Sequence, residues 1–121
     1  MNTKHAALPQ ISEAVFQAQI VDLAHLYGWK VCHFRAARSQ RGWRTPCAAD
    51  GEGYVDLFMV HPKWKLKLWV EAKSLIGKRT PRQDMWAEWL IEAGCDYRLW
   101  RPTNEDFNEA VAVLGGDKKE Q

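Results

Sequence analysis

The chain has 121 residues, a length that fits one domain with a single hydrophobic core. A composition of 46% hydrophobic and 26% charged residues is typical of a globular protein and argues against a disordered chain, a collagen-like repeat or a membrane span. The net charge of +2, from 17 basic and 15 acidic residues, is too small to indicate a nucleic-acid binder by itself. We therefore expect one domain over residues 1–121, with flexible ends at 1–10 and 115–121.

The first third of the chain predicts a helix, a short strand and a long loop. Apolar residues at helical spacing predict a helix over 12–27, with Ser12 as its N-cap and Gly28 as its stop. A strand is expected over 29–34. Residues 35–53 show no periodicity and predict an irregular loop, and a loop of this length in a compact domain is often functional.

Two apolar runs follow, at 54–60 and 66–73, and the HPKWK sequence between them predicts a hairpin turn that contains His61. The sequence Thr80-Pro81-Arg82-Gln83 is typical of a helix start, because Thr80 can act as the cap and Gln83 can complete a capping box.

The helix that starts there is expected to end at Gly94, and its stripe of Trp86, Trp89, Leu90 and Ala93 predicts that both tryptophans lie in the core. A strand over 95–100 and a helix over 104–114 complete an α-β-β-β-α-β-α order.

The predicted hairpin carries an acidic residue in each strand, where Asp is normally excluded and Glu is disfavoured. If the turn centres on Lys63-Trp64, residues whose numbers sum to 127 lie opposite each other, which places Asp56 directly across from Glu71. Lys73 then shares their face, because side chains alternate along a strand. The other face is wholly apolar and consists of Val55, Leu57, Met59, Leu68, Val70 and Ala72.

Two neighbouring carboxylates repel each other and need a shared proton, a cation or a lysine beside them. Divalent cations such as Mg²⁺ prefer oxygen ligands and often take one or two carboxylates with water and a substrate phosphate. The alternative is an exposed strand face whose charges are balanced by Lys73 and the basic turn. Glu13 leaves two interpretations open in the same way: it is a helix-dipole partner or a third carboxylate aimed at the same cation.

The charge distribution is more informative than the net charge. Residues 28–53 hold five basic and two acidic residues (+3), residues 63–82 hold seven and one (+6), and residues 84–109 hold two and seven (−5). A basic middle region is what a phosphate-backbone binder needs, although solvated surface charge is the alternative. The candidate phosphate contacts are Arg35, Arg38, Arg41, Arg44, Lys78, Arg79 and Arg82.

The spacing Asp56–X14–Glu71-Ala72-Lys73 across a hairpin, within this element order, resembles the PD-(D/E)XK nuclease superfamily and, more narrowly, its VRR-NUC branch. Four segments carry the resemblance in order: SEAVFQAQIVDLAHLYGW, GYVDLFMV, LWVEAKSLIGKRTPRQDMW and AGCDYRLWRP. The chain has Val55 where the family commonly has a Pro before the Asp. The resemblance implies an α/β fold with a restriction-endonuclease-like αβββαβ core, in which helices flank a mixed central sheet.

The resemblance also implies a catalytic set of Asp56, Glu71, Lys73 and Gln83. By the same resemblance Asp56 and Glu71, the Ala72 carbonyl and Glu13 would bind Mg²⁺ or Mn²⁺. Lys73 would position the attacking water or steady the phosphate. Gln83 matches the family's helix Gln, while its local role is the capping box.

The function that the resemblance implies is metal-dependent endonuclease cleavage of DNA, selective for branched or junction structure, by a homodimer. Two alternatives stay open: a non-catalytic DNA-binding or assembly protein on the same fold, and a sequence-specific restriction-type nuclease. Phosphate-binding glycine motifs are absent, so no nucleotide cofactor is expected. The absence of a signal-peptide pattern and the odd, sparse set of three cysteines predict a cytoplasmic protein with no membrane partner. That the cell is bacterial or phage-infected is implied by the resemblance alone.

Overall fold

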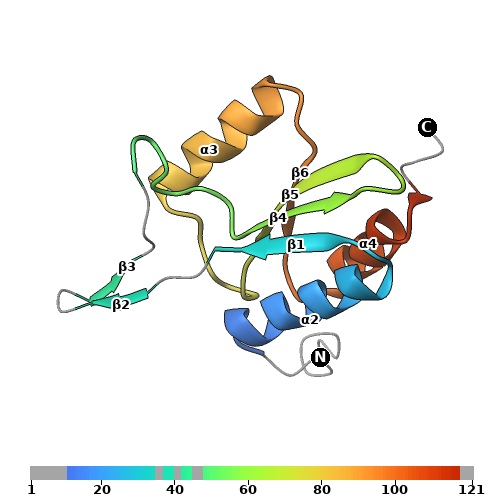
Figure 1. The fold of residues 1–121 in the computed structure, drawn as a ribbon. Helices are drawn as coiled ribbons and strands as arrows, with labels where there is room; N and C mark the ends of the chain where they lie inside the picture. The colour runs from blue at the N-terminus through green and yellow to red at the C-terminus, as the bar shows by residue number, and fades with distance from the viewer. Residues whose placement is uncertain (1–10, 35–36, 40–41, 45–47, 118–121) are drawn as a thin grey trace.

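The computed structural model describes residues 11–34, 37–39, 42–44 and 48–117, with the backbone alone over 37–39 and 42–44. Within these ranges the chain forms an α/β structure with a four-stranded mixed sheet and three helices (Figure 1). The predicted flexible ends fall partly outside the described residues, at 1–10 and 118–121.

The strand order in the sheet is β1-β4-β5-β6, and its strands are β1 (Lys30–His33), β4 (Leu57–His61), β5 (Leu66–Ala72) and β6 (Tyr97–Trp100). The pairs β1–β4 and β4–β5 are antiparallel, and β5–β6 is parallel. The parallel strand is reached through a helical crossover, as such connections require. The predicted α-β-β-β-α-β-α order is therefore confirmed, apart from an added hairpin.

That hairpin corrects the prediction that residues 35–53 are irregular. The strands β2 (Ala37–Ser39) and β3 (Gly42–Arg44) pair only with each other and project from the sheet (Figure 1). Such short strands are held by backbone hydrogen bonds and form a sheet separate from the four-stranded one. Their sequence therefore needs no apolar alternation, and periodicity could not predict them.

The three helices are α2 (Glu13–Leu26), α3 (Pro81–Glu92) and α4 (Asn104–Leu114), whose bounds agree with the predicted ranges to within two residues. Each begins after a capping hydroxyl: the side chains of Ser12, Thr80 and Thr103 accept a backbone N–H from the first turn. The sequence predicted these starts because capping is local chemistry.

The core lies between one face of the sheet and the helices α2 and α4, which lie side by side along that face (Figure 1). All six residues predicted for the apolar hairpin face are 0–1% exposed. Five of them, all except Val55, belong to one core cluster with Phe16, Ile20 and Ala24 of α2 and with Ala110 and Leu114 of α4. We call this face of the sheet the inner face and the opposite one the outer face.

Two expectations about aromatic and turn residues are wrong. Trp86 and Trp89 do not lie in the core: Trp89 is 40% exposed, and α3 buries Ala87 and Leu90 instead. The helical stripe identified residues that share a side of α3, but it could not show which of them are covered: Leu90 is buried, whereas Trp89 is not. His61 is the last residue of β4, 5% exposed, with its Nε2 2.8 Å from the Tyr27 carbonyl oxygen.

In the part of the chain that the structure describes, no helix has the length and apolar character needed to cross a membrane.

Because the two faces of the β4–β5 hairpin differ in burial, truncations of neighbouring β4 side chains should lower the free energy of unfolding by different amounts. Met59 is fully buried on the inner face, so Met59→Ala should lower the free energy of unfolding by about 2–5 kcal/mol. Val60 is half-buried on the outer face, so Val60→Ala should lower the free energy of unfolding by roughly 1 kcal/mol or less. Urea titration measures both values, and equal losses would contradict the assigned faces.

Candidate active site

The antiparallel register of β4 and β5 brings the two acidic residues of the hairpin together. Leu57 pairs with Val70 and Phe58 with Trp69, which is the predicted register, and its continuation places Asp56 opposite Glu71. Asp56 lies in a bend just before β4, and its Oδ2 accepts the Ala72 backbone N–H at 3.2 Å. We call Asp56 and Glu71, which lie on the outer face, the carboxylate pair.

The carboxylate of Glu71 is buried and makes no hydrogen bond to the described residues. Its side chain is 1% exposed, and neither carboxylate oxygen has a hydrogen-bond partner among the described residues. Burial, reinforced by the negative charge of Asp56, raises the pKa of Glu71 to about 8, although the positive charges of Lys73 and Arg79 oppose this. With such a pKa the group keeps its proton at neutral pH, unless a bound cation takes the place of that proton.

Asp56 is more moderately perturbed. Burial raises its pKa to about 6, while the hydrogen bond from the Ala72 N–H and the positive charge of Lys73 lower it. Within the pair, the negative charge of Asp56 makes Glu71 harder to ionise. A cation between them would relieve both the repulsion and the cost of burial.

Lys73 lies next to the pair and is 7% exposed. Its Nζ donates a hydrogen bond to Gln83 Oε1 at 3.0 Å, and the same oxygen accepts the Thr80 backbone N–H at 2.8 Å. Gln83 therefore closes the capping box of α3, as the sequence predicted, and also contacts Lys73, while its catalytic role stays a prediction. The start of α3 is thereby tied to the site.

The helix α2 contributes Gln17, which the sequence analysis missed. Gln17 is 8% exposed, and its Nε2 donates to the Ala72 carbonyl oxygen at 3.1 Å and to Glu13 Oε2 at 3.4 Å. Its Oε1 lies 3.0 Å from His33 Nε2. The available signal was an amide within the apolar stripe of a helix.

Glu13 lies at the margin of the site. Its negative charge acts on both members of the carboxylate pair and contributes to raising the pKa of each. Among the described residues, no three His, Cys, Asp or Glu side chains are grouped closely enough to hold a metal ion by themselves. The oxygen donors at the centre are thus the carboxylate pair and the Ala72 carbonyl.

The predicted basic residues fall into two groups. Arg35 and Arg41 lie outside the described residues, and Arg38 and Arg44 belong to β2 and β3, where only the backbone is described. The second group consists of Lys78, Arg79 and Arg82. The Arg82 guanidinium donates to the Asp50 carbonyl oxygen at 3.4 Å.

Within the second group, Lys78 is exposed, whereas Arg79 is engaged by its neighbours. The Arg79 guanidinium donates to Tyr97 Oη at 2.9 Å and pairs with Asp84 at 2.9 Å. Burial, opposed by that hydrogen bond, raises the pKa of Tyr97 to about 12. The sequence analysis did not place Tyr97 near the site.

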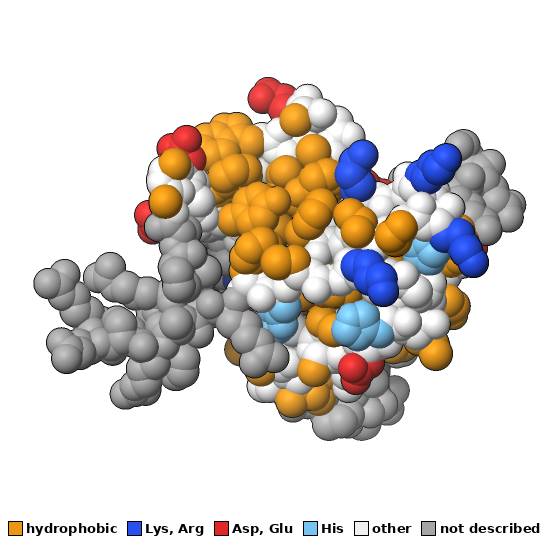
Figure 2. Space-filling model, viewed as in Figure 1, with side chains coloured by type: hydrophobic (Ala, Val, Ile, Leu, Met, Phe, Trp, Pro, Cys, Tyr) orange, Lys and Arg blue, Asp and Glu red, His pale blue; other side chains and the backbone are white. Residues whose placement is uncertain are grey.

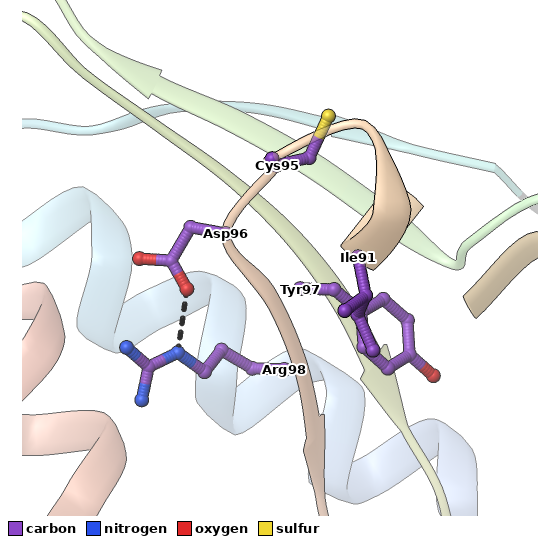
Figure 3. Close-up of a pocket in the computed structure, with 6 residues that line it drawn as sticks. Ile91, Cys95, Asp96, Tyr97 and Arg98 are labelled. Atoms are coloured by element: carbon purple, nitrogen blue, oxygen red, sulfur yellow. Dashed lines mark hydrogen bonds and ion pairs between the residues drawn. The ribbon is translucent and has the colours of Figure 1, made fainter. Parts of the chain in front are cut away.

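A shallow pocket of about 410 Å³ lies elsewhere, where α3 leads into β6 (Figure 3). Ile91 and Tyr97 lie on one side of it, and Arg98 pairs with Asp96 at 2.7 Å. Its lining includes neither member of the carboxylate pair and neither Lys73 nor Gln83, so the candidate site is not this pocket.

Comparison of the chain with protein-family models, with curated proteins and with solved structures gives no match. The chemistry must therefore be inferred from the residues themselves. They bring together two buried carboxylates, a backbone carbonyl and a lysine held by an amide. This arrangement can bind a hard cation and present a positive charge beside it.

The unpaired burial of Glu71 predicts a defined pH dependence of stability in EDTA. Unfolded Glu71 ionises near its ordinary pKa of 4.5, whereas folded Glu71 keeps its proton up to about 8, so the free energy of unfolding should fall between these values as the pH rises. Glu71→Gln removes this loss and should raise the melting temperature at pH 8 by about 4 °C or more, equivalent to about 1 kcal/mol.

Glu88→Gln, at an exposed position of α3, is the matched control and should leave the pH profile unchanged. Thermal unfolding followed by circular dichroism from pH 5 to about pH 8 measures all three proteins. If the difference in melting temperature between the wild type and Glu71→Gln does not grow with pH, the assigned burial of the Glu71 charge is wrong.

Proposed function

We propose that the protein is a metal-dependent nuclease that hydrolyses DNA phosphodiester bonds on a restriction-endonuclease-like core of the VRR-NUC type. The observation that carries the proposal is Glu71, a buried carboxylate without a hydrogen-bond partner among the described residues, opposite Asp56 and beside Lys73. Burying two carboxylates side by side lowers the stability of the fold, whereas exposed or apolar residues at these positions would not. A strand face with a purely structural role would therefore not keep the pair.

The donor set fits Mg²⁺ or Mn²⁺. Asp56, Glu71 and the Ala72 carbonyl would hold the ion, with Glu13 at the margin and water or phosphate in the remaining positions. A bound ion of this kind lowers the pKa of water and neutralises charge that develops on the phosphate. Gln17 supports the arrangement because its amide anchors the Ala72 carbonyl from α2.

Lys73 supplies the fixed positive charge of the mechanism. One of its Nζ protons is directed to Gln83, and the others remain to contact the scissile phosphate or to orient the attacking water. Because Lys73 is already held in place, its charge needs little reorganisation as the phosphate becomes more negative. The cation and Lys73 would thus both stabilise the negative charge that develops on the phosphate.

DNA is the proposed polymer because basic residues dominate the chain around this site, from 63 to 82, where Glu71 is the only acidic residue. The resemblance to the VRR-NUC branch favours selection by DNA structure, such as a branch or junction. A two-fold homodimer would place two active sites on two strands.

Cleavage tests the proposal directly. We expect the protein to cut at least one of linear duplex, single-stranded, flap and four-way-junction DNA with Mn²⁺ or Mg²⁺, and not with EDTA. Asp56→Asn, Glu71→Gln and Lys73→Ala should each reduce the rate by at least about 100-fold, the scale expected for an electrostatic group in contact with the reacting atoms. Gel electrophoresis of end-labelled DNA measures the rates.

The controls are Asp22→Asn and Glu88→Gln, which alter exposed residues of α2 and α3. They should cut like the wild type. Absence of cleavage on every DNA with both metals, or full activity in Lys73→Ala, would refute the nuclease. Binding of Mn²⁺ is tested separately, because the ion should raise the melting temperature of the wild type and not of Glu71→Gln.

The double role of Gln83 can be separated by a pair of variants. Thr80→Ala and Gln83→Ala both break the capping box and should each lower the free energy of unfolding by about 1 kcal/mol. Only Gln83→Ala also removes the partner of Lys73. We therefore expect Gln83→Ala to reduce cleavage roughly tenfold relative to Thr80→Ala, whereas equal activities would assign Gln83 to capping alone.

A further inference from the structure

Among the described residues, a group of exposed or half-buried aromatic side chains lies on and beside the outer face, and none of its members belongs to the core cluster. We call it the aromatic shelf, and it consists of Phe34, Tyr54, Phe58, Trp69, Trp86 and Trp89. Figure 2 shows hydrophobic side chains gathered in this region, between α3 and β1. Two of the six, Phe34 and Trp89, are 39% and 40% exposed.

The rings of the shelf form a connected structure. Tyr54 contacts Phe34 and Trp86 edge-on, with ring centroids 5.4 and 4.9 Å apart. Its hydroxyl oxygen also accepts the Trp69 Nε1–H at 3.0 Å, and Trp69 lies 5.1 Å from Phe58. These contacts hold the rings in place, so a planar ligand would meet surfaces that are already ordered.

The shelf is continuous with the proposed active site. Phe58 follows Asp56 by two residues and Trp69 precedes Glu71 by two, so the Phe58–Trp69 pair lies next to the carboxylate pair on the same face. Two residues of a strand span about 7 Å, which is on the scale of one extended nucleotide. A strand cleaved at the pair must pass close to these rings.

Positively charged side chains lie on one side of the aromatic shelf, which favours binding of a nucleic-acid strand there. The next outer-face positions are Lys67 on β5 and Lys30 on β1, both exposed and both aligned with Val60. Figure 2 shows Lys and Arg side chains on the side of the patch away from α3, and acidic ones around α3. Along β4 and β5 the order is therefore carboxylates, aromatic rings and lysines.

We propose that the aromatic shelf stacks unpaired bases of the strand that enters the carboxylate pair, while Lys30 and Lys67 contact its phosphates. The inference rests on the proposed nuclease function and defines its substrate class as single-stranded DNA or DNA with a splayed single-stranded arm. Stacked base pairs in an intact duplex hide their faces, so only an unpaired base can lie on Trp69 or Phe58.

Binding without cleavage tests the shelf. In EDTA, fluorescence anisotropy should show that labelled oligo-dT binds the wild type more tightly than a blunt hairpin duplex does. Trp69→Ala and Phe58→Ala should each weaken oligo-dT binding by roughly tenfold, the scale of one lost base–aromatic stack. Trp69→Phe keeps a ring and should retain most of the affinity, and Lys67→Gln should reduce the salt dependence of binding.

Phe107→Ala is the matched control, because Phe107 is 39% exposed but lies on α4, which covers the inner face. It should bind like the wild type. Circular dichroism and urea unfolding identify any variant that does not fold, and Phe58→Ala and Trp69→Ala serve as independent tests of the same surface.

The outcomes separate the shelf from the nuclease. Unchanged oligo-dT affinity in folded Trp69→Ala and Phe58→Ala overturns the shelf, even if the wild type cleaves DNA. Binding that depends on both rings supports it, even if no metal gives cleavage and the nuclease fails. If Trp69→Ala instead converts a dimer to a monomer in sedimentation, and oligo-dT leaves the tryptophan fluorescence unchanged, the face joins two copies of the chain and the proposal is wrong.

Discussion

The antiparallel register of β4 and β5 is the constraint on which the rest of the structure depends. It assigns alternate residues to opposite faces, so one face of the hairpin is 0–1% exposed beneath α2 and α4 while the other carries Asp56 and Glu71. A slip of one residue would bury the carboxylates in the core and expose the apolar set. The same pairing that builds the core therefore also assembles the candidate site.

A site on this hairpin has an energetic consequence for the whole domain. Glu71 is held away from water next to another acidic group, and its pKa of about 8 expresses a preference for the protonated form. Lys73 lies next to Glu71 and is joined through Gln83 to the cap of α3, so the helix start and Lys73 share one hydrogen-bond network. Stability and cation affinity are thereby expected to change together.

Much of the fold and the centre of the site could be predicted because they depend on local rules. Period-two alternation and an even turn were enough to pair Asp56 with Glu71, and capping chemistry was enough to begin α3 at Pro81. Gln17 and Tyr97 could not be predicted as neighbours of the site. They reach it from α2 and β6, and no local pattern encodes which distant elements pack together.

The sequence by itself determined the element order apart from the β2–β3 hairpin, the register of the β4–β5 hairpin and the face that carries the carboxylates, because each depends on residues close together in the chain. Tertiary structure decided which faces are covered. It left Trp86 and Trp89 outside the core and buried His61 against the Tyr27 carbonyl. Coverage depends on where whole helices lie over a sheet, and the apolar stripe of a single helix carries no information about that layer.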